Sequence, residues 1–442
     1  MRHTVRLSLL ASVLVLNTHA ADDLAGIFKE GKASGQIRAF YIDRDYAPGA
    51  NRDGLSLGGY LKYETGTFYG FSAAAAFYTT NKLDKKSDVA AENDTTLFGP
   101  NGNNETYLGE AYLQYKNGNT AFKAGRQKLD TPMAGSDDAR MLPSLFEAYV
   151  LSNTDVKDTT LIAAHVTKFA AGTFANAYNS TTAGSVLALT SGYSGVANAT
   201  DYVGKFTDMG TYAIGENTNG VSVAAAIYSG MPGLKLQVWD YYARNILNAV
   251  YAEANYGWSY SNAMAPYVAA QWINERDVGN NAIITKVKSD FIAAKVGLKV
   301  SNVDVYAALS HNSKDASSVI NGGTITPWGG MSAYTQGMVT RHQFMAGTDT
   351  WKVAGNYNWK DMGTNLNTGV YYASFDMDAL NGYSANHSWT ATEAGFDMIY
   401  TPQTVKNLQL RFRGNFPRNF KETATGAATG WDEYRFIANY NF

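Results

Sequence analysis

The feature that most constrains this chain is a strict alternation of side-chain types in residues 431–442. Tyr434, Phe436, Ala438 and Tyr440 occupy every second position, and mostly polar residues stand between them. Successive side chains of a β-strand point to opposite sides, so this alternation predicts a strand with one apolar and one polar face. The apolar face of such a strand contacts either a protein core or lipid.

Similar segments recur along the whole chain and number about eighteen, mostly near the ten-residue length of a tilted membrane strand. Aromatic residues make up 13% of the chain, and 30 Tyr stand against 9 Pro, a balance that favours strands over helices. Before the terminal segment, the predicted strands are 36–42, 55–66, 69–79, 105–118, 120–127, 146–152, 160–169, 220–230, 234–243, 248–258, 265–273, 291–300, 303–311, 350–360, 367–375, 393–400 and 408–416.

Short and long connections alternate between these segments, with a short link at 244–247 as an exception. The tight turns carry Gly, Asn or Pro, which suit turn geometry. The long connections are polar and comprise 80–104, 128–145, 171–218, 276–288, 313–348, 377–390 and 418–430. An up-and-down antiparallel transmembrane β-barrel predicts this alternation, with short periplasmic turns and long extracellular loops. No linker interrupts the pattern, so we expect 21–442 to form one all-β barrel domain of about eighteen strands.

The parity of a residue, meaning its odd or even position along a strand, determines the face to which its side chain points, and the charged residues then indicate which face contacts lipid. In residues 408–416, Leu408, Leu410 and Phe412 share one side, whereas Arg411 and Arg413 share the other. A charge on the lipid face costs about 2–4 kcal/mol at the midplane, so we expect the charged side to line a water-filled lumen. The inward basic residues predicted by parity are Arg38, Lys62, Lys235, Lys299, Lys352, Arg411, Arg413 and Arg435, and the inward acids are Glu64, Glu110, Glu253, Glu275, Asp304 and Asp397.

The N-terminus carries the pattern of a secretory signal peptide. Arg2 and Arg6 precede an apolar run over 7–16, and a small-residue site follows at 18–20. The run is about half as long as the roughly 20 residues of a spanning helix, so we expect residues 1–20 to be removed on export. Net charge is −2 and Cys is absent, which argues against nucleic acid as a partner and excludes disulfides and thiolate chemistry.

No enzyme motif is present: the chain lacks HExxH, the GxSxG elbow and the phosphate-binding GxxxxGK[ST]. We therefore predict a channel rather than an enzyme. Two membrane alternatives remain open, namely an outer-membrane barrel hydrolase and a surface adhesin or receptor that uses the loops 171–218 and 313–348. A soluble multi-strand sandwich is a third alternative, and it predicts solubility without detergent.

The connection after residues 120–127 carries the most informative charges. Residues 128–153 read KLDTPMAGSDDARMLPSLFEAYVLSN, with Pro132 and Pro143 interrupting strand pairing. The GRQKLD stretch followed by D-x-R-M-x-P-x-x-F-E-A resembles the constriction-loop region of OprD-type porins, including the major outer-membrane porins of Campylobacter-like bacteria. By itself, the charge run is also consistent with a solvated outer loop. Strand parity places Arg126 outward, so either the strand has ended or a bulge re-aims this residue.

The resemblance implies that residues 128–145 fold into the lumen and narrow it, with Asp137, Asp138 and Arg140 at the narrowest point and Glu147 near it. It also implies a basic strip that guides carboxylate-bearing solutes, because OprD-type channels carry one. The pore-lining basic residues expected for this strip are Arg38, Lys352, Arg411, Arg413 and Arg435.

Further expectations concern location, assembly and metal. The resemblance implies a bacterial outer-membrane porin for passive diffusion of small hydrophilic solutes and ions, and trimers are common among such porins. Tyr440 and Phe442 resemble the C-terminal signature that the barrel-assembly machinery reads. No cofactor is expected, although Asp130, Asp137 and Asp138 offer oxygen ligands of the kind that calcium prefers. EF-hand spacing is absent around them.

Overall fold

The computed structural model describes residues 23–83, 92–261, 263–279, 286–330 and 332–442. The predicted signal peptide, 1–20, lies outside these residues. The described part contains twenty strands, of which β8 (Thr207–Asp208) and β19 (Lys421–Glu422) have only two residues each. The other eighteen strands correspond one to one to the eighteen predicted segments.

The first nine of these eighteen strands are β1 (Lys32–Ala47), β2 (Arg52–Glu64), β3 (Phe71–Lys82), β4 (Glu105–Asn117), β5 (Thr120–Gln127), β6 (Leu145–Asn153), β7 (Thr159–Ala170), β9 (Val221–Tyr228) and β10 (Leu234–Ala243). The second nine are β11 (Leu247–Gly257), β12 (Met264–Asp277), β13 (Lys288–Val300), β14 (Val303–Asn312), β15 (Asp349–Asn358), β16 (Leu366–Met377), β17 (Trp389–Tyr400), β18 (Leu408–Arg418) and β20 (Ala428–Asn441).

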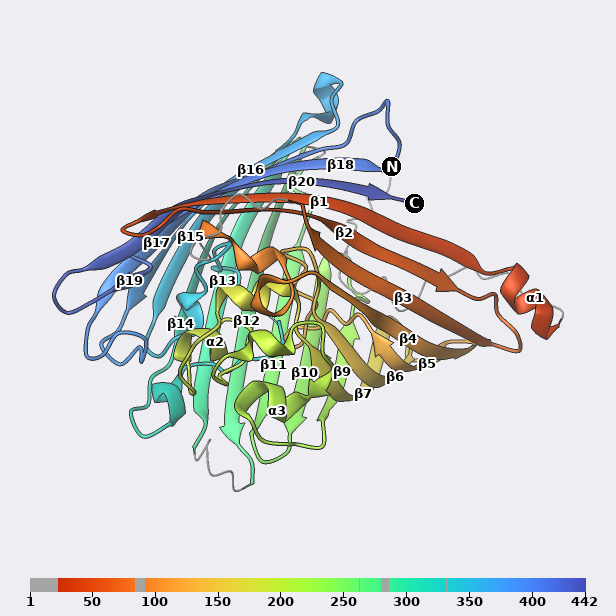
Figure 1. Ribbon diagram of the computed structural model, residues 1–442, viewed down its shortest axis with the longest axis horizontal. Coiled ribbons are helices and arrows are strands. Elements are labelled where there is room, and N and C mark those ends of the chain that lie inside the picture. Colours follow the sequence, from red (N-terminus) through yellow and green to blue (C-terminus); the bar gives the residue numbers. More distant parts are fainter. Residues whose placement is uncertain (1–22, 84–91, 262, 280–285, 331) are drawn as a thin grey trace.

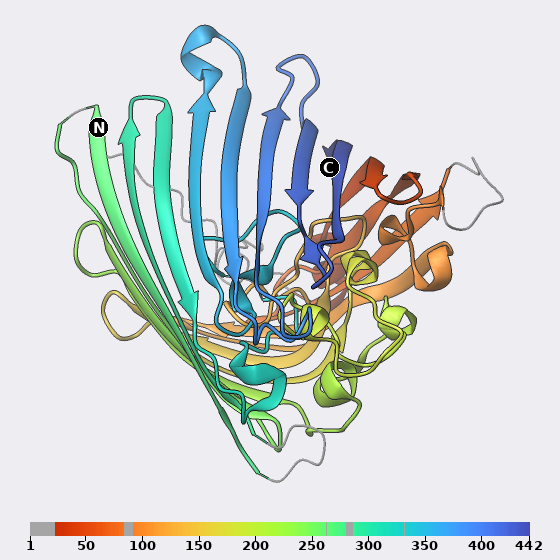
Figure 2. The ribbon, with the colours of Figure 1, turned by 90° about the vertical axis from the view of Figure 1, so that its left-hand side faces the viewer.

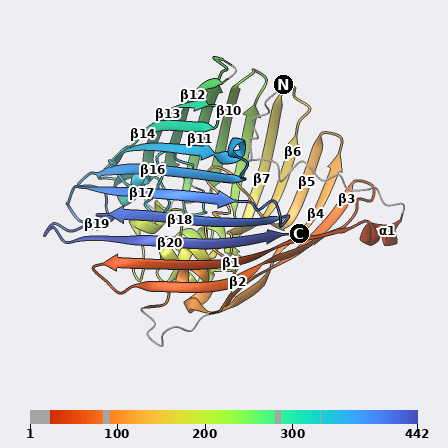
Figure 3. The ribbon, with the colours of Figure 1, turned by 90° about the horizontal axis from the view of Figure 1, so that it is seen from above.

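These strands form one closed antiparallel barrel. Each strand pairs with the next along the chain, β7 pairs with β9, and β18 pairs with β20. The first and last strands then pair from Gln36↔Asn441 to Ala47↔Gly430, and Figure 3 shows β1 and β20 side by side. Closure satisfies the backbone groups of both edge strands, which a bilayer requires. The prediction of an eighteen-strand up-and-down barrel is confirmed.

The two ends of the barrel differ, as the connection lengths predicted. Tight turns lie at one end and most of the long connections at the other (Figure 2). Two connections on the long-loop side are short, at 48–51 and 244–246. Among the described residues, none of the helices has the length and apolarity needed to cross a bilayer. The helices are α1 (Leu24–Lys29), α2 (Val186–Leu189), α3 (Met209–Ile214) and the 3-10 turns η2 (Thr95–Leu97), η3 (Pro100–Gly102), η4 (Thr173–Ala177), η5 (Ala199–Tyr202), η6 (Val319–Gly322), η7 (His342–Phe344) and η8 (Trp359–Met362).

Burial follows the predicted parity. In β20, Glu433 and Arg435 are buried, whereas Phe436 between buried neighbours is 51% exposed. In β13, the outward side chains Ile292 and Val296 are more than half exposed. Apolar side chains that remain exposed on successive strands are expected of a lipid-facing wall. The polar side therefore faces the inside of the barrel.

The inside of the barrel is partly filled by three of its long connections. Residues 128–144, 171–220 and 313–348 supply many fully buried side chains to the largest apolar cluster, among them Met133, Tyr212, Trp328 and Phe344. Figure 1 shows α2 and α3, from the second of these connections, close to the strands of the wall. The adhesin alternative uses the loops 171–218 and 313–348 at the surface, and the composition of 171–218 suits an exposed segment. In the structure, however, much of both segments packs inward.

Candidate pore constriction

The connection 128–144 leaves the wall at β5 and reaches β1 and β20, several strands away around the barrel. Arg140 donates through Nη2 to Oε1 of Glu433 on β20 at 2.9 Å. Arg38 on β1 donates through Nη1 to Oδ1 of Asp138 at 2.7 Å and to the backbone carbonyl of Arg140. Both contacts join residues far apart in sequence, so they hold the connection against the inner wall.

Arg140 has no exposed surface. Its guanidinium lies 4.3 Å from the centre of the Phe174 ring and shares Glu433 with Arg44 and Arg435. Arg44 also pairs with Asp94 at 3.0 Å, so two buried carboxylates offset part of the cost of burying three guanidinium groups, and a net positive charge remains. Arg140 therefore anchors the connection to the wall, whereas the sequence placed it at the narrowest point of a channel.

Asp137 joins all three in-folded connections. Its carboxylate accepts two hydrogen bonds from Arg341, at 2.7 and 3.0 Å, and one from the Tyr193 hydroxyl at 2.6 Å. The backbone of Asp137 has φ +37°, a left-handed conformation that Asp tolerates better than most residues. The Arg341 guanidinium also lies over the rings of Phe174, Tyr178 and Tyr193. We call Asp137, Arg341 and Tyr193 the Asp137 clasp.

Asp138 is the most accessible of the three central charges, with one third of its side chain exposed. It lies between Arg38 and Lys128, whose Nζ is 3.5 Å from Oδ2. Burial would raise the pKa of the Asp138 carboxyl, but the Arg38 and Lys128 cations lower it to about 2. Asp138 is thus ionised at neutral pH and exposed to solvent inside the barrel.

Two wall carboxylates hold the connection 313–348 by its main chain. Glu393 on β17 accepts the backbone N–H groups of Met338, Val339 and Thr340, the last at 2.6 Å. Glu275 on β12 accepts the backbone N–H of Ile325 at 2.8 Å. Parity predicted that Glu275 faces inward, but Glu393 was not among the predicted inward acids, and the use of either carboxylate as an anchor for a connection was not predicted.

The connections 128–144 and 313–348 also contact each other through their backbones. Gly135 N donates to the carbonyl of Trp328 at 3.0 Å. Gly329 has φ +74°, and a Cβ atom there would lie 2.3 Å from the Gly135 carbonyl oxygen, so only glycine permits this approach. A Trp flanked by Pro327 and two glycines in a polar segment is a signal that could have indicated inward packing.

The predicted basic strip lies on neighbouring strands. Arg413 pairs in register with Arg435, and Arg411 forms a two-point ion pair with Asp397. Arg413 donates no hydrogen bond to any described residue, and its closest carboxylate oxygen, on Asp397, is 3.4 Å away. Six arginines share four carboxylates on this wall, which leaves an excess of positive charge. They are Arg38, Arg44, Arg140, Arg411, Arg413 and Arg435, with Asp94, Asp138, Asp397 and Glu433.

Lys352, the remaining predicted lining residue, lies on β15. Its Nζ donates to the carbonyl of Gln336 at 2.6 Å and lies 4.6 Å from the centre of the Tyr371 ring. Lys352 therefore faces the inside of the barrel, against the connection 313–348. The cation supports this connection as well as adding positive charge.

Glu147 occupies a different place from the one expected. It shares a side of β6 with the exposed residues Tyr149 and Leu151, so it lies on the outer face of the wall. Arg126 pairs with it in register, which agrees with the outward parity of Arg126. A bulge in the β6–β7 pairing next to Glu147 brings Lys168 opposite it. The carboxylate of Glu147 therefore lies on the outer face of the barrel and not at the constriction.

The three aspartates proposed for calcium do not form one ligand set. Asp130 accepts hydrogen bonds from Ser136, Asp137 binds Arg341, and Asp138 binds Arg38. Among the described residues, no group of three acidic or histidine side chains has metal-binding geometry. The donors present therefore do not fit a calcium ion.

The C-terminal residues complete the wall. Phe442 exchanges backbone hydrogen bonds with Gly35, at 2.9 and 3.1 Å. Tyr440 and Phe442 both keep exposed aromatic rings. The last strand is thus paired along its whole length, with its aromatic face outward.

A closed barrel with an apolar outside, a charged inside and in-folded connections defines a transmembrane β-barrel channel. The profile of the family described as "outer membrane porin, OprD family" matches residues 25–442. The chain belongs to this family and is an outer-membrane porin. A search of curated proteins finds no match.

Solved structures with the same fold come from Pseudomonas aeruginosa. OpdK with vanillate has 16% identity and a TM-score of 0.74, covering 94% of this chain and 100% of that chain. OccK2 (OpdF) in complex with glucuronate has 16% identity and a TM-score of 0.71, covering 94% and 99%. OccK8 (OprE) has 18% identity and a TM-score of 0.72, covering 94% and 99%. At these identities, the likeness establishes the fold.

Proposed function

We propose that this porin favours small solutes that carry a carboxylate. The observation that carries the proposal is the excess of arginine over carboxylate on β1, β18 and β20, together with the free donors of Arg413. A planar guanidinium binds a carboxylate through two parallel hydrogen bonds. Two of the similar structures, OpdK with vanillate and OccK2 in complex with glucuronate, contain carboxylate anions, which supports the same solute class.

The constriction supplies the opposing charge in this proposal. Asp138 and Lys128 each keep about a third of the side chain exposed and lie 3.5 Å apart, so a solute that passes meets an acidic and a basic group within a short distance. Screening acts over about 8 Å at physiological salt, so such a field orients a solute only in a narrow gap. Asp137 and Arg140 act indirectly, because they fix the position of the connection that carries Asp138.

Reversal potentials across planar bilayers in a salt gradient test the basic strip. We expect the double variant Arg411→Gln/Arg413→Gln to shift selectivity towards cations, because two positive charges leave the lumen wall. Arg418→Gln is the matched control, since Arg418 pairs with Asp432 at the exposed end of β18. An unchanged reversal potential in the double variant would remove the strip from the selectivity mechanism.

We also propose two protein partners. The exposed aromatic rings of Tyr440 and Phe442 suit recognition by the barrel-assembly machinery, and deletion of Phe442 should lower the yield of folded protein in the outer membrane. A homotrimer is the second proposal, and light scattering of the detergent-extracted porin tests it by giving the number of chains per particle.

A further inference from the structure

The short helix α1 presents two large apolar side chains to its surroundings. Leu24 is 69% exposed and Phe28 is 65% exposed. They are four residues apart, so they lie next to each other on one side of the helix. Gly26 and Ile27, by contrast, are partly buried. Exposed apolar patches mark contact surfaces for protein or membrane. We call Leu24 and Phe28 the apolar face of α1.

Two hydrogen bonds hold α1 against the periplasmic end of the wall. The Tyr63 hydroxyl donates to the carbonyl of Phe28, and the backbone N–H of Gly66, in the β2–β3 turn, donates to the carbonyl of Ile27 at 2.7 Å. A Cβ atom at Gly31 would collide with the Tyr63 hydroxyl, so glycine permits this close approach. Figure 1 shows α1 beyond the ends of β1 and β2, away from α2 and α3. The helix is therefore attached to the rim of the barrel.

Tyr63 attaches α1 to the lipid side of the wall. It shares one side of β2 with Leu57 and Leu61, and all three side chains are exposed. Ser56 and Glu64, on the other side of β2, are buried inside the barrel. Because successive side chains of a strand point to opposite sides, the Tyr63 ring points outward. The helix that it holds is thus on the outer side of the rim and not in the mouth of the lumen.

The lipid-facing wall around α1 ends in exposed aromatic rings. Tyr69, in the β2–β3 turn, is 83% exposed, and Phe71, where β3 begins, is 54% exposed. Phe442, at the end of the chain, keeps half of its surface exposed. Aromatic rings at the ends of membrane strands form a girdle at the level of the lipid headgroups. Since Gly66 of the same turn bonds to α1, the apolar face of α1 lies at the level of this girdle.

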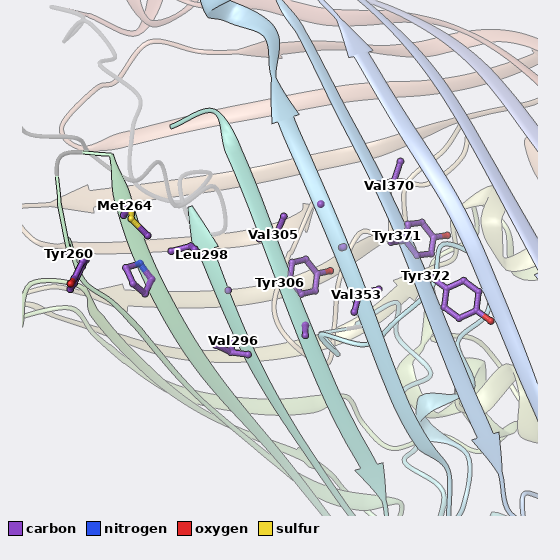
Figure 4. Close-up of a pocket in the computed structure, with 15 residues that line it drawn as sticks. Tyr260, Met264, Val296, Leu298, Val305, Tyr306, Val353, Val370, Tyr371 and Tyr372 are labelled. Atoms are coloured by element: carbon purple, nitrogen blue, oxygen red, sulfur yellow. The ribbon is translucent and has the colours of Figure 1, made fainter. Parts of the chain in front are cut away.

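The wall over β12–β16 shows the same order of side chains away from α1. Valines of neighbouring strands, among them Val305 and Val353, line an apolar hollow on its outer face (Figure 4). Tyr260, just before β12 begins, lies at the edge of this hollow and is 73% exposed. Apolar side chains above and an aromatic ring at the periplasmic end are the arrangement that lipid covers. Leu24 and Phe28 extend such a surface beyond β1 and β2.

We propose that the apolar face of α1 inserts into the periplasmic leaflet of the outer membrane and anchors the rim of the barrel there. Through Tyr63 this face is continuous with the lipid-facing wall, and that continuity identifies lipid as its partner. Helices that lie in a membrane interface bury their apolar side about 5–10 Å deep. Six residues alone bind a bilayer weakly, but attachment to the wall makes the insertion intramolecular. Lys29 and Glu30 follow Phe28 and cancel in charge, so insertion does not require anionic lipid.

Electron paramagnetic resonance of a spin label measures the insertion directly, and the chain has no native Cys to compete for the label. In phosphatidylcholine vesicles, the label at Phe28→Cys should collide with oxygen, relative to a water-soluble nickel complex, several times more than the label at Lys29→Cys, about 100° further around the helix. Ile292→Cys on the outer wall and Ser301→Cys in a periplasmic turn give the lipid and water references. Equal access of the nickel complex to positions 28 and 29 would overturn the proposal. A label at position 28 that is shielded from both reagents would also overturn it, because a second copy would then cover α1.

Removal of the apolar face provides the second arm. A spin label at the exposed position Ala25→Cys reports the motion of α1. In vesicles, the double change Leu24→Ser/Phe28→Ser should sharpen the lines of its spectrum, because the helix leaves the bilayer and moves faster. Lys29→Ser is the matched control on the same helix and should leave the spectrum unchanged. Heat-modifiable gel migration and single-channel conductance establish that each variant is a folded channel, since α1 lies outside the wall. An unchanged spectrum in the folded double variant would overturn the anchor.

Discussion

Breaking the Asp137 clasp should loosen the constriction while the barrel stays intact. The Asp137 side chain is 12% exposed, and replacing Arg341 by Met removes the cation that pairs with its carboxylate. Breaking one partner of a buried ion pair costs about 3–5 kcal/mol. Since about 1.4 kcal/mol corresponds to a factor of ten, the open fraction of the clasp should rise by about two to three and a half orders of magnitude.

Single-channel recording measures this effect, because the in-folded connections determine the pore. We expect Arg341→Met to show frequent conductance steps where the native channel is steady. The double variant Asp137→Asn/Arg341→Met removes both charges, and replacing a buried pair as a whole is often close to neutral. It should therefore recover much of the native behaviour. A steady Arg341→Met channel, or a double variant as noisy as the single one, would refute the role of the clasp.

Two further predictions concern the connection 313–348. Burial lowers the pKa of His342 to about 4, although its Nε2–H group donates to the Phe420 carbonyl. Unfolded histidine titrates near 6.5, so this site contributes full stability above pH 6.5 and loses about 3 kcal/mol as the pH falls towards 4. We therefore expect conductance noise of the native channel to increase as the pH falls from 6.5 towards 4. His342→Phe should remove most of this increase, and an equal increase in the variant would exclude His342 as its source. Glu393→Gln should release residues 338–340, because an amide group presents donors as well as an acceptor to three backbone N–H groups. Faster proteolysis of this connection in folded protein would confirm it, whereas native resistance would contradict it.

The wall of this porin could be predicted from sequence because lipid outside and water inside require apolar and polar residues to alternate along every strand. Phe412 and Arg413 illustrate it: each residue's type identifies its side, and the structure places both accordingly. The same rule predicted that Arg38, Arg411, Arg413 and Arg435 face inward, and pairing of β20 with both β1 and β18 brings them onto neighbouring strands. Their pairing with Asp397, Asp138 and Glu433 depends on strand register, which parity alone does not provide.

The interior could be predicted only in part. Residues 128–145 were predicted to fold inward from a family resemblance, whereas residues 313–348 have the polar composition of an exposed loop. That connection is buried because wall carboxylates satisfy its backbone, and such contacts between distant residues leave no periodic signal. Glu147 was misplaced because the family resemblance put it near the constriction, whereas its parity with Tyr149 points outward.

The hydrogen bonds between Glu393 and the backbone of residues 338–340 have a consequence for how the solute preference of such a channel can change. Within residues 338–340, Glu393 accepts hydrogen bonds from peptide N–H groups and from no side chain, so the attachment does not depend on which side chains these residues carry. Proline is the exception, because it lacks the N–H group. Val339 and Thr340 are buried, but Met338 is partly exposed and can thereby vary in size and charge on a fixed backbone, so a new solute preference can arise there without rebuilding the barrel.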